Sequence, residues 1–214
     1  MRGLENYGIA SFEANNKYGF PLVAPCKIGV PLSAIQWIDF DTAISRAKRD
    51  KSVFEKYNGL HFYIDDYKFQ RVWNYPQRYI DFLKRFDYVI MPDFSLYYNF
   101  PQALQIYNKY RNHWLAAYFS VNGVNIVPDI SLSTPECFDW SAEAYPQGSL
   151  VAFCDVGSKR DKLSREVIPR AFEFMRKNLS PSHIIYFTRA KSVEFEDDCI
   201  TVVRLPFFRS RGGE

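Results

Sequence analysis

Two short stretches of this chain nearly repeat each other. Residues 90–96 read Ile-Met-Pro-Asp-Phe-Ser-Leu, and residues 126–132 read Ile-Val-Pro-Asp-Ile-Ser-Leu. Each copy follows an apolar run, and Asp93 and Asp129 are separated by about the length of one strand-plus-helix unit. Because proline ends the hydrogen-bonded ladder of a strand, the residue after it emerges at the carboxyl edge of the sheet. The repeat therefore predicts consecutive parallel strands, each followed by an aspartate.

Apolar runs alternate with helical patterns along the chain after Asn58-Gly59, an order typical of parallel β-α units. We expect strands at residues 60–64, 88–91, 124–127, 149–155, 183–187 and 199–205. The sequence thus predicts an α/β fold with a mostly parallel sheet and alternating helices. The acidic strand ends follow in simple chain order, which favours an incomplete or irregular barrel-like sheet. The alternative is an open doubly wound sheet.

Length and composition indicate one domain. With 214 residues, 47% of them apolar, the chain can build a single α/β domain over residues 1–214. Prolines and loop-forming residues predict an irregular N-terminal lead over residues 1–40. Residues 207–214 should form a frayed tail.

The charge balance permits several partners and demands none. A net charge of +3 allows nucleic acid, a nucleotide or a host protein as partner. The first residues lack the apolar core of a signal peptide, and no stretch approaches the roughly 18 apolar residues of a spanning helix. The four cysteines are scattered without a CxxC pair. We therefore expect a cytoplasmic protein with reduced thiols, no membrane partner and no zinc motif.

Acidic residues follow four successive predicted strands. Carboxylates gathered at one sheet edge could bind Mg²⁺ or Mn²⁺, which prefer oxygen ligands, and such an ion could polarise a phosphoryl group. Asp65, Asp93 and Asp129 are the predicted metal ligands, and Asp155 is the fourth strand-end acid. The alternative is that each aspartate only caps the turn or helix that follows it.

A glycine-containing segment follows the predicted strand at 149–155 and opens a helix. Free N–H groups, the helix dipole and two cations could bind phosphate there, at Gly157, Ser158, Lys159 and Arg160. The pattern of a P-loop is missing. Ser158 and Asp161 also fit a capping box, which needs no ligand.

One arginine and two histidines carry further expectations. Arg111 interrupts an apolar and aromatic helix face, so burial should pair it with a carboxylate, such as Asp87 or Asp93, or with an anionic ligand. His61 and His183 are each expected to open a strand, on the side opposite the acidic strand ends.

Three segments together resemble a domain-of-unknown-function family common in bacteriophages, plasmids and bacterial mobile elements. They are residues 64–73, 92–97 and 110–118. The resemblance implies a phage or mobile-element origin and the host bacterial cytoplasm, and it assigns no reaction. Asp65, Asp93 and Arg111 match the family pattern and become the candidate catalytic residues. The resemblance also implies that most members of this family carry Ser-Thr where this chain has Cys154-Asp155, which weakens Asp155 as a shared catalytic group.

Two hypotheses follow. The first is an enzyme that acts on a phosphate-containing ligand, a nucleotide or nucleic acid, with metal-assisted phosphoryl chemistry at the carboxyl edge of the sheet. The second is a non-catalytic binding protein for nucleic acid, a signalling nucleotide or a host protein. The sequence does not choose between them, and it leaves the oligomeric state open.

Overall fold

The structure is a computed structural model that describes residues 6, 9–12, 14–26, 28–131, 137–156, 162–193, 195 and 197–206. The predicted tail at 207–214 and the predicted phosphate-binding residues 157–160 lie outside the described residues.

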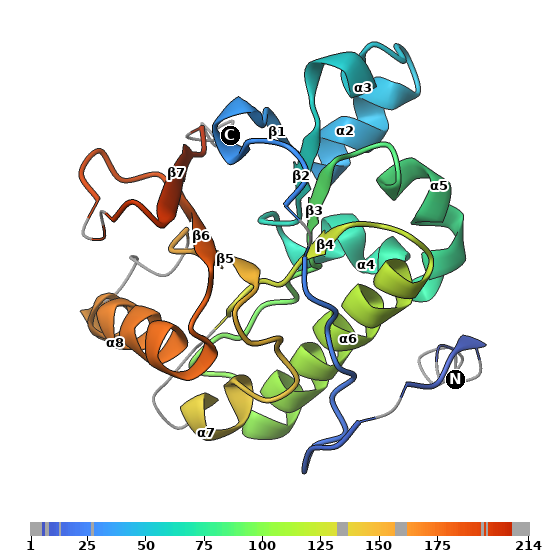
Figure 1. Ribbon diagram of the computed structural model, residues 1–214. Helices are drawn as coiled ribbons and strands as arrows, with labels where there is room; N and C mark the ends of the chain where they lie inside the picture. The colour runs from blue at the N-terminus through green and yellow to red at the C-terminus, as the bar shows by residue number, and fades with distance from the viewer. Residues whose placement is uncertain are drawn as a thin grey trace, which may run out of the picture.

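Seven parallel strands form the centre of the fold (Figure 1). They are β1 (Trp37–Asp39), β2 (Gly59–His61), β3 (Tyr88–Ile90), β4 (Ile126–Val127), β5 (Leu150–Cys154), β6 (His183–Thr188) and β7 (Ile200–Arg204). Hydrogen bonds join β1-β2-β3-β4 into one sheet and β5-β6-β7 into another. A parallel bridge between Asp129 and Ala152 connects the two sheets beyond the end of β4. The strands therefore lie side by side in chain order, without the reversal of a doubly wound sheet.

Helices alternate with these strands and lie around the outside of them (Figure 1). They are η2 (Leu32–Ala34), α2 (Phe40–Ala47), α3 (Val53–Lys56), α4 (Asp66–Asn74), η3 (Pro76–Tyr79), α5 (Ile80–Leu83), α6 (Gln102–Val121), α7 (Phe138–Ser141) and α8 (Lys162–Leu179). Local chemistry explains the starts of two of these helices. Asp39 Oδ1 accepts a hydrogen bond from Thr42 N and so caps α2, while Pro76 occupies the first position of η3.

The sheet is curled like a barrel. The rings of Trp37 in β1 and Phe187 in β6 meet edge to face, with centroids 5.0 Å apart. In a flat sheet, five strand spacings of about 4.8 Å would separate β1 from β6 by roughly 24 Å. The strands must therefore wrap around a shared interior. Among the described residues no hydrogen-bonded pair joins β7 to β1, so the predicted incomplete, barrel-like α/β sheet is confirmed.

Side chains alternate between the inside of the curl and the surrounding helices. The inner cluster draws apolar residues from several strands, among them Tyr88, Ile90, Val127, Leu150, Ala152, Ile185 and Phe187. The outer cluster takes the intervening residues and packs them on the helices, among them Ile38, Leu60, Val89, Ile126, Val151, Phe153, Ile184 and Tyr186. We call the carboxyl edge of the curled sheet the mouth of the curl. Strand-end residues can meet there when their side chains point to the same face of the sheet.

The N-terminal segment is more ordered than the sequence suggested. Strand β1 lies inside the stretch expected to be irregular, because three residues are too short a run to show a strand pattern. Earlier in the N-terminal segment, the backbone of Cys26 forms an isolated antiparallel β-bridge with Leu150 at the start of β5. The Tyr88 hydroxyl accepts hydrogen bonds from Gly29 N and Val30 N. The lead thus packs against the amino end of the curled sheet.

One expected position is corrected by the structure. His61 is the last residue of β2 and not a strand-opening residue, so it lies at the carboxyl end with the acids. The predicted strand began and ended later than the observed one, which moved His61 to the wrong edge. His183 does open β6, as expected. Over the described residues, no helix combines the length and apolar character needed to cross a bilayer.

Candidate functional site

The two copies of the repeat meet at the carboxyl edge of the curled sheet. Ser131 Oγ lies 2.6 Å from Asp93 Oδ1 and 2.7 Å from Asp129 Oδ2. Asp93 follows β3 and Asp129 follows β4, and these strands are neighbours. The parallel order therefore brings together two of the acids that the sequence singled out.

This arrangement cannot be satisfied by two ionised carboxylates. A serine hydroxyl has one proton, so it donates to one carboxylate only. The other short contact is favourable when that carboxyl is itself protonated and donates to Ser131 Oγ. Burial and the neighbouring Asp129 charge raise the pKa of Asp93 well above its usual range, and burial raises the pKa of Asp129 to about 6. The Asp93–Ser131–Asp129 group therefore shares a proton near neutral pH.

The first copy of the repeat makes an analogous contact. Ser95 Oγ donates to Asp66 Oδ1 at 2.9 Å, and Ser95 N also faces that carboxylate. Asp66 follows β2, so in both copies the serine reaches the acid of the preceding strand. The charge of Asp66 also contributes to the raised pKa of Asp93. The repeat is thus a structural unit that links each strand end to the previous one.

Tyr63 completes the partners of Asp129. Its hydroxyl donates to Asp129 Oδ1 at 2.5 Å, and burial beside that carboxylate raises the pKa of Tyr63 well above its usual range. The phenol therefore stays protonated and remains a donor. The ring packs on Phe187 from the inner face, with centroids 4.9 Å apart. Asp129 is consequently fixed in orientation, with only 3% of its surface exposed.

A buried lysine lies close to the same group. Lys109 of α6 is completely buried, and its Nζ donates to the Tyr145 hydroxyl at 2.5 Å. Tyr145 in turn donates to the Asp129 carbonyl oxygen at 2.5 Å. Burial lowers the pKa of Lys109 to about 8, although Asp129 and Asp93 oppose that shift. Sequence reasoning missed Lys109 because a single lysine in a long helix is normally solvent-exposed.

Asp65 lies apart from this group. Its carboxylate forms an ion pair with Lys68 Nζ at 3.1 Å, and two-thirds of the side chain is exposed (66%). Asp65 precedes the first residue of α4 and faces solvent, whereas Asp66, the next residue, turns toward the loop after β3. The three acids expected to bind one ion are therefore not gathered together. Over the described residues, no three His, Cys, Asp or Glu side chains are placed to hold a metal.

Arg111 is buried on aromatic rings and binds neutral groups. Its guanidinium lies 3.6 Å from the ring centroid of Phe94 and donates to Gln70 Oε1 at 3.0 Å and Asn108 Oδ1 at 2.6 Å. The expected pairing with Asp87 or Asp93 is wrong. Asp87 instead accepts from Asn58 Nδ2 at 3.1 Å. The ring of Phe94 and the amide oxygens of Gln70 and Asn108 thus take the place of the carboxylate that was expected to pair with the buried guanidinium.

The remaining predicted residues lie near the next strand end. Asp155 follows β5 and accepts hydrogen bonds from the Tyr186 hydroxyl at 2.5 Å and Thr188 Oγ1 at 3.0 Å. Because Tyr186 belongs to the outer cluster, Asp155 faces the helix side of the sheet and not its interior. The predicted phosphate-binding residues Gly157, Ser158, Lys159 and Arg160 come next in the chain, outside the described residues.

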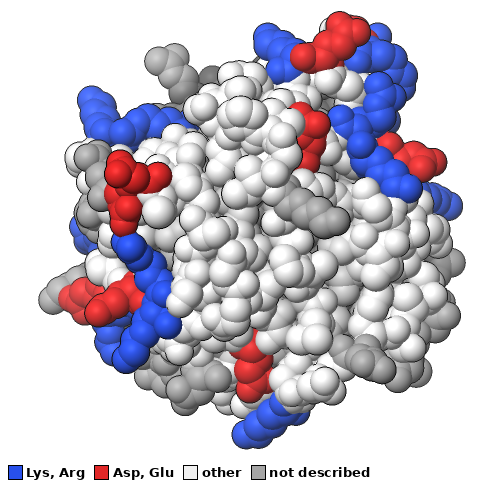
Figure 2. Space-filling model, in the orientation of Figure 1, with Lys and Arg blue, Asp and Glu red and all other residues white. Residues whose placement is uncertain are grey.

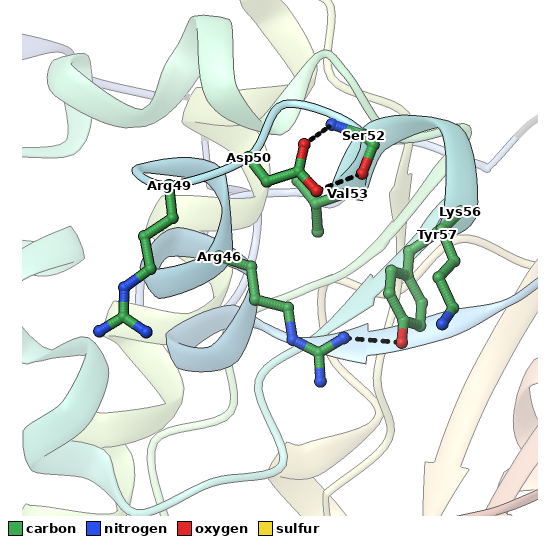
Figure 3. A pocket seen from close by; sticks show the side chains of 7 residues that line it. All are labelled: Arg46, Arg49, Asp50, Ser52, Val53, Lys56 and Tyr57. Atoms are coloured by element: carbon green, nitrogen blue, oxygen red, sulfur yellow. Dashed lines mark hydrogen bonds between the residues drawn. The ribbon is translucent and has the colours of Figure 1, made fainter.

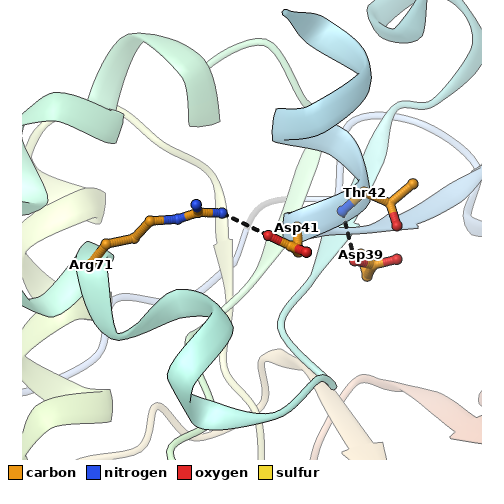
Figure 4. Close-up of polar contacts among 4 residues, drawn as sticks. All are labelled: Asp39, Asp41, Thr42 and Arg71. Carbon is orange, nitrogen blue, oxygen red and sulfur yellow. Dashed lines mark hydrogen bonds and ion pairs between the residues drawn. The ribbon is translucent and has the colours of Figure 1, made fainter. Parts of the chain in front are cut away.

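The mouth of the curl also contains the ends of β1 and β2. Asp39 caps α2, and Asp41 in the first turn of that helix pairs with Arg71 Nη2 of α4 at 2.8 Å (Figure 4). His61 lies opposite Asp39 in the β1-β2 register. Burial lowers the pKa of His61 to about 4. A neutral imidazole therefore lies at this edge, where its ring stacks on that of Tyr63 with centroids 5.5 Å apart.

The chain resembles two bacteriophage proteins. It is 33% identical to the Gene 1 protein of Mycobacterium phage L5 over 158 residues, which cover 73% of this chain and 65% of that protein. It is 29% identical to the Gene 1 protein of Mycobacterium phage D29 over 132 residues, which cover 62% of this chain and 49% of that protein. The chain thus matches less than two-thirds of the length of either relative. No solved structure matches it.

A family model confirms the resemblance found in the sequence. It matches residues 12–205, a longer span than the segments that first suggested the family. The matched region includes every strand of the curled sheet and both copies of the repeat. The chain belongs to the family described as a domain of unknown function, DUF4417.

Proposed function

We propose that this protein acts on a phosphate-containing ligand, a nucleotide or nucleic acid, at the mouth of the curled sheet. The observation that supports this most is the Asp93–Ser131–Asp129 group, in which one hydroxyl contacts two carboxyls at 2.6 and 2.7 Å. Paired acids with raised pKa values are common at catalytic sites, because one can donate a proton while the other accepts one. Their place at the carboxyl ends of parallel strands agrees with the usual location of sites in such folds.

The group could work with a divalent cation. Mg²⁺ or Mn²⁺ bound beside Asp93 and Asp129 would replace the shared proton and offset the repulsion between the two carboxylates. Such an ion would polarise a phosphoryl oxygen of the ligand. Asp65 and Arg111 belong to this proposal only through their match to the family pattern, since neither contacts the group.

The predicted phosphate-binding residues enter this proposal by their place in the sequence alone. Gly157, Ser158, Lys159 and Arg160 follow β5, and the β5 residue Ala152 pairs with Asp129. The described strand β5 therefore lies beside Asp129. The phage relatives support a further proposal, that the protein works in the cytoplasm of a bacterial host.

A non-catalytic binding protein is the second candidate. The observation in its favour is that both carboxylate oxygens of Asp129 already accept hydrogen bonds, one from Tyr63 and one from Ser131. In that case the group would be a structural connection between strand ends, and the partner would be nucleic acid, a signalling nucleotide or a host protein.

Turnover assays separate the two candidates. Purified protein is incubated with labelled single-stranded DNA, RNA and nucleotides, with and without Mn²⁺, and the products are resolved. The enzyme proposal expects turnover that falls at least 100-fold in Asp93→Asn. Asp81→Asn is the matched control, because it removes an exposed carboxylate of α5 that lies outside the group. Absence of turnover, or turnover unchanged in Asp93→Asn, would reject the enzyme in favour of the binding protein.

A further inference from the structure

A second candidate site lies between α2 and α3, away from the acidic group. It is a pocket of about 370 Å³ (Figure 3). The lining residues are Arg46, Arg49, Asp50, Ser52, Val53, Lys56 and Tyr57. Helix α2 starts at the carboxyl end of β1, and α3 precedes β2. The pocket is therefore at the amino end of the strands, opposite the mouth of the curl.

The positive charge of the chain is concentrated in this segment. Residues 46–57 contain five cations, Arg46, Lys48, Arg49, Lys51 and Lys56, against the two acids Asp50 and Glu55. The segment therefore has a net charge of +3, equal to that of the whole chain, and the rest of the chain is neutral in total. Figure 2 shows lysine and arginine side chains gathered where Figure 1 places α2 and α3.

The cations of the pocket are available to a ligand. Arg46 Nη1 donates to the Tyr57 hydroxyl at 2.9 Å, and Lys56 Nζ lies 5.6 Å from the centroid of the same ring (Figure 3). Among the described residues, Arg46, Arg49 and Lys56 form no ion pair, unlike Arg71 with Asp41. Asp50 is occupied locally, because its carboxylate accepts from Ser52 N and Ser52 Oγ.

We propose that this pocket binds the phosphodiester backbone of a nucleic acid. Arginine offers a planar fork of donors that matches phosphate oxygens, and lysine adds a mobile point charge. A cationic groove with an aromatic side chain is the combination by which proteins hold the backbone and stack the bases of single-stranded nucleic acid. A membrane surface is disfavoured, since the exposed large hydrophobic residues of the described chain all lie outside α2 and α3.

The inference is independent of the chemistry proposed at the mouth of the curl. A protein that grips nucleic acid at one end of the strands could process it at the other end or only hold it. The two ideas therefore fail separately: loss of backbone binding concerns Arg49 and Lys56, and loss of turnover concerns Asp93.

The test is fluorescence anisotropy with 5′-labelled 20-nucleotide single-stranded DNA, RNA and duplex DNA, between 50 and 200 mM NaCl. The full chain is compared with Arg49→Ala/Lys56→Ala. The matched control, Arg170→Ala/Lys177→Ala, removes the same charge from the exposed face of α8. We expect the pocket variant to bind at least 10-fold more weakly at 50 mM NaCl. In the pocket variant, the magnitude of the slope of log binding constant against log salt concentration should decrease by about 1.4 to 1.8, because two phosphate contacts are lost. The control variant should change the binding constant less than twofold.

Three results would overturn the proposal. One is the absence of binding by the unaltered protein, and another is an equal loss in the pocket and control variants. The third is that the unaltered protein binds phosphatidylserine vesicles and not oligonucleotides, and that the pocket variant loses this vesicle binding. That result would assign the pocket to a membrane. Thermal melting of each variant verifies that both are folded.

Discussion

Ser131 Oγ lies 2.6 Å from the carboxylate of Asp93, so the second copy of the repeat contacts the acid of the first. The same serine lies 2.7 Å from Asp129 of its own copy. A hydroxyl between two carboxyls makes their protonation interdependent, and this property can be measured without knowing the ligand.

The stability of the protein should depend on pH through this group. The folded state raises the pKa of Asp129 to about 6 and that of Asp93 well above its usual range. Between about pH 4 and pH 7 the folded chain therefore holds protons that the unfolded chain has released, and the free energy of unfolding falls as pH rises. Asp93→Asn cannot ionise, so it should exceed the unaltered protein in stability by about 1–3 kcal/mol at pH 7 and match it at pH 4.

Urea denaturation at the two pH values measures this difference. Asp65→Asn serves as the control, because it replaces an exposed carboxylate that does not contact the group. A pH profile of Asp93→Asn that is parallel to that of the unaltered protein would show that Asp93 is ionised in the folded state.

Removing the bridging hydroxyl should be costly. Ser131→Ala leaves the buried Asp129 and the half-buried Asp93 without their shared partner. Both pKa values should rise further, because the serine hydrogen bond lowers each of them. We expect a loss of about 1–3 kcal/mol at neutral pH. The control is Ser95→Ala, in the first copy, where Ser95 N still contacts the carboxylate of Asp66. A larger loss in Ser95→Ala than in Ser131→Ala, measured by chemical denaturation, would contradict this account.

Lys109 should be replaceable with a gain in stability. Burial lowers its pKa to about 8, so the folded state disfavours the charged side chain at pH 7. Lys109→Met keeps the length of the side chain and should stabilise the fold by about 1–3 kcal/mol at pH 7. The stability advantage of Lys109→Met should shrink toward pH 9.5. Above about pH 8 the folded protein holds a neutral lysine while the unfolded chain still keeps its proton, so the free energy of unfolding of the unaltered protein rises with pH. An advantage that stays constant between pH 7 and 9.5 would place the pKa of Lys109 at its ordinary value.

Glycine is needed at position 59 because side chains of β1 and of the residues just before it pack directly against this position. A Cβ atom on this residue would lie 2.5 Å from Ile35 Cγ2 and 2.6 Å from Trp37 Cε3. Gly59→Ala should therefore destabilise the protein by about 1–3 kcal/mol, as overpacking does elsewhere. Gly29→Ala is the matched control, since a Cβ atom there meets nothing within 4 Å. Thermal melting of the two variants decides the point, and equal melting temperatures would disprove it.

Much of the fold followed from the sequence, and less of the site. The repeat and the alternation of apolar runs predicted six of the seven strands and the meeting of Asp93 with Asp129. Strand β1 escaped because Trp37–Asp39 is too short to show a period and gains its stability from contacts with distant residues. Asp66, and not the predicted Asp65, contacts the loop after β3, and the sequence does not tell which of two adjacent acids faces that loop.

Other partners could be found only in three dimensions. Tyr63 and Lys109 lie far along the chain from Asp129, and nothing in their immediate sequence distinguishes them from ordinary core or surface residues. Ser131 is different, because it occupies the same place in both copies of the repeat. A serine two residues after each strand-end aspartate was a signal that the sequence contained.

The contact between Trp37 and Phe187 has a consequence for synthesis of the chain. These two residues are separated by most of the described sequence, so Trp37 lacks its edge-to-face partner until the ribosome has made the sixth strand. Until then an aromatic surface stays open to water and to other nascent chains, and folding must wait for a late, long-range encounter. A truncation before residue 187 should therefore yield a chain that needs a chaperone or aggregates.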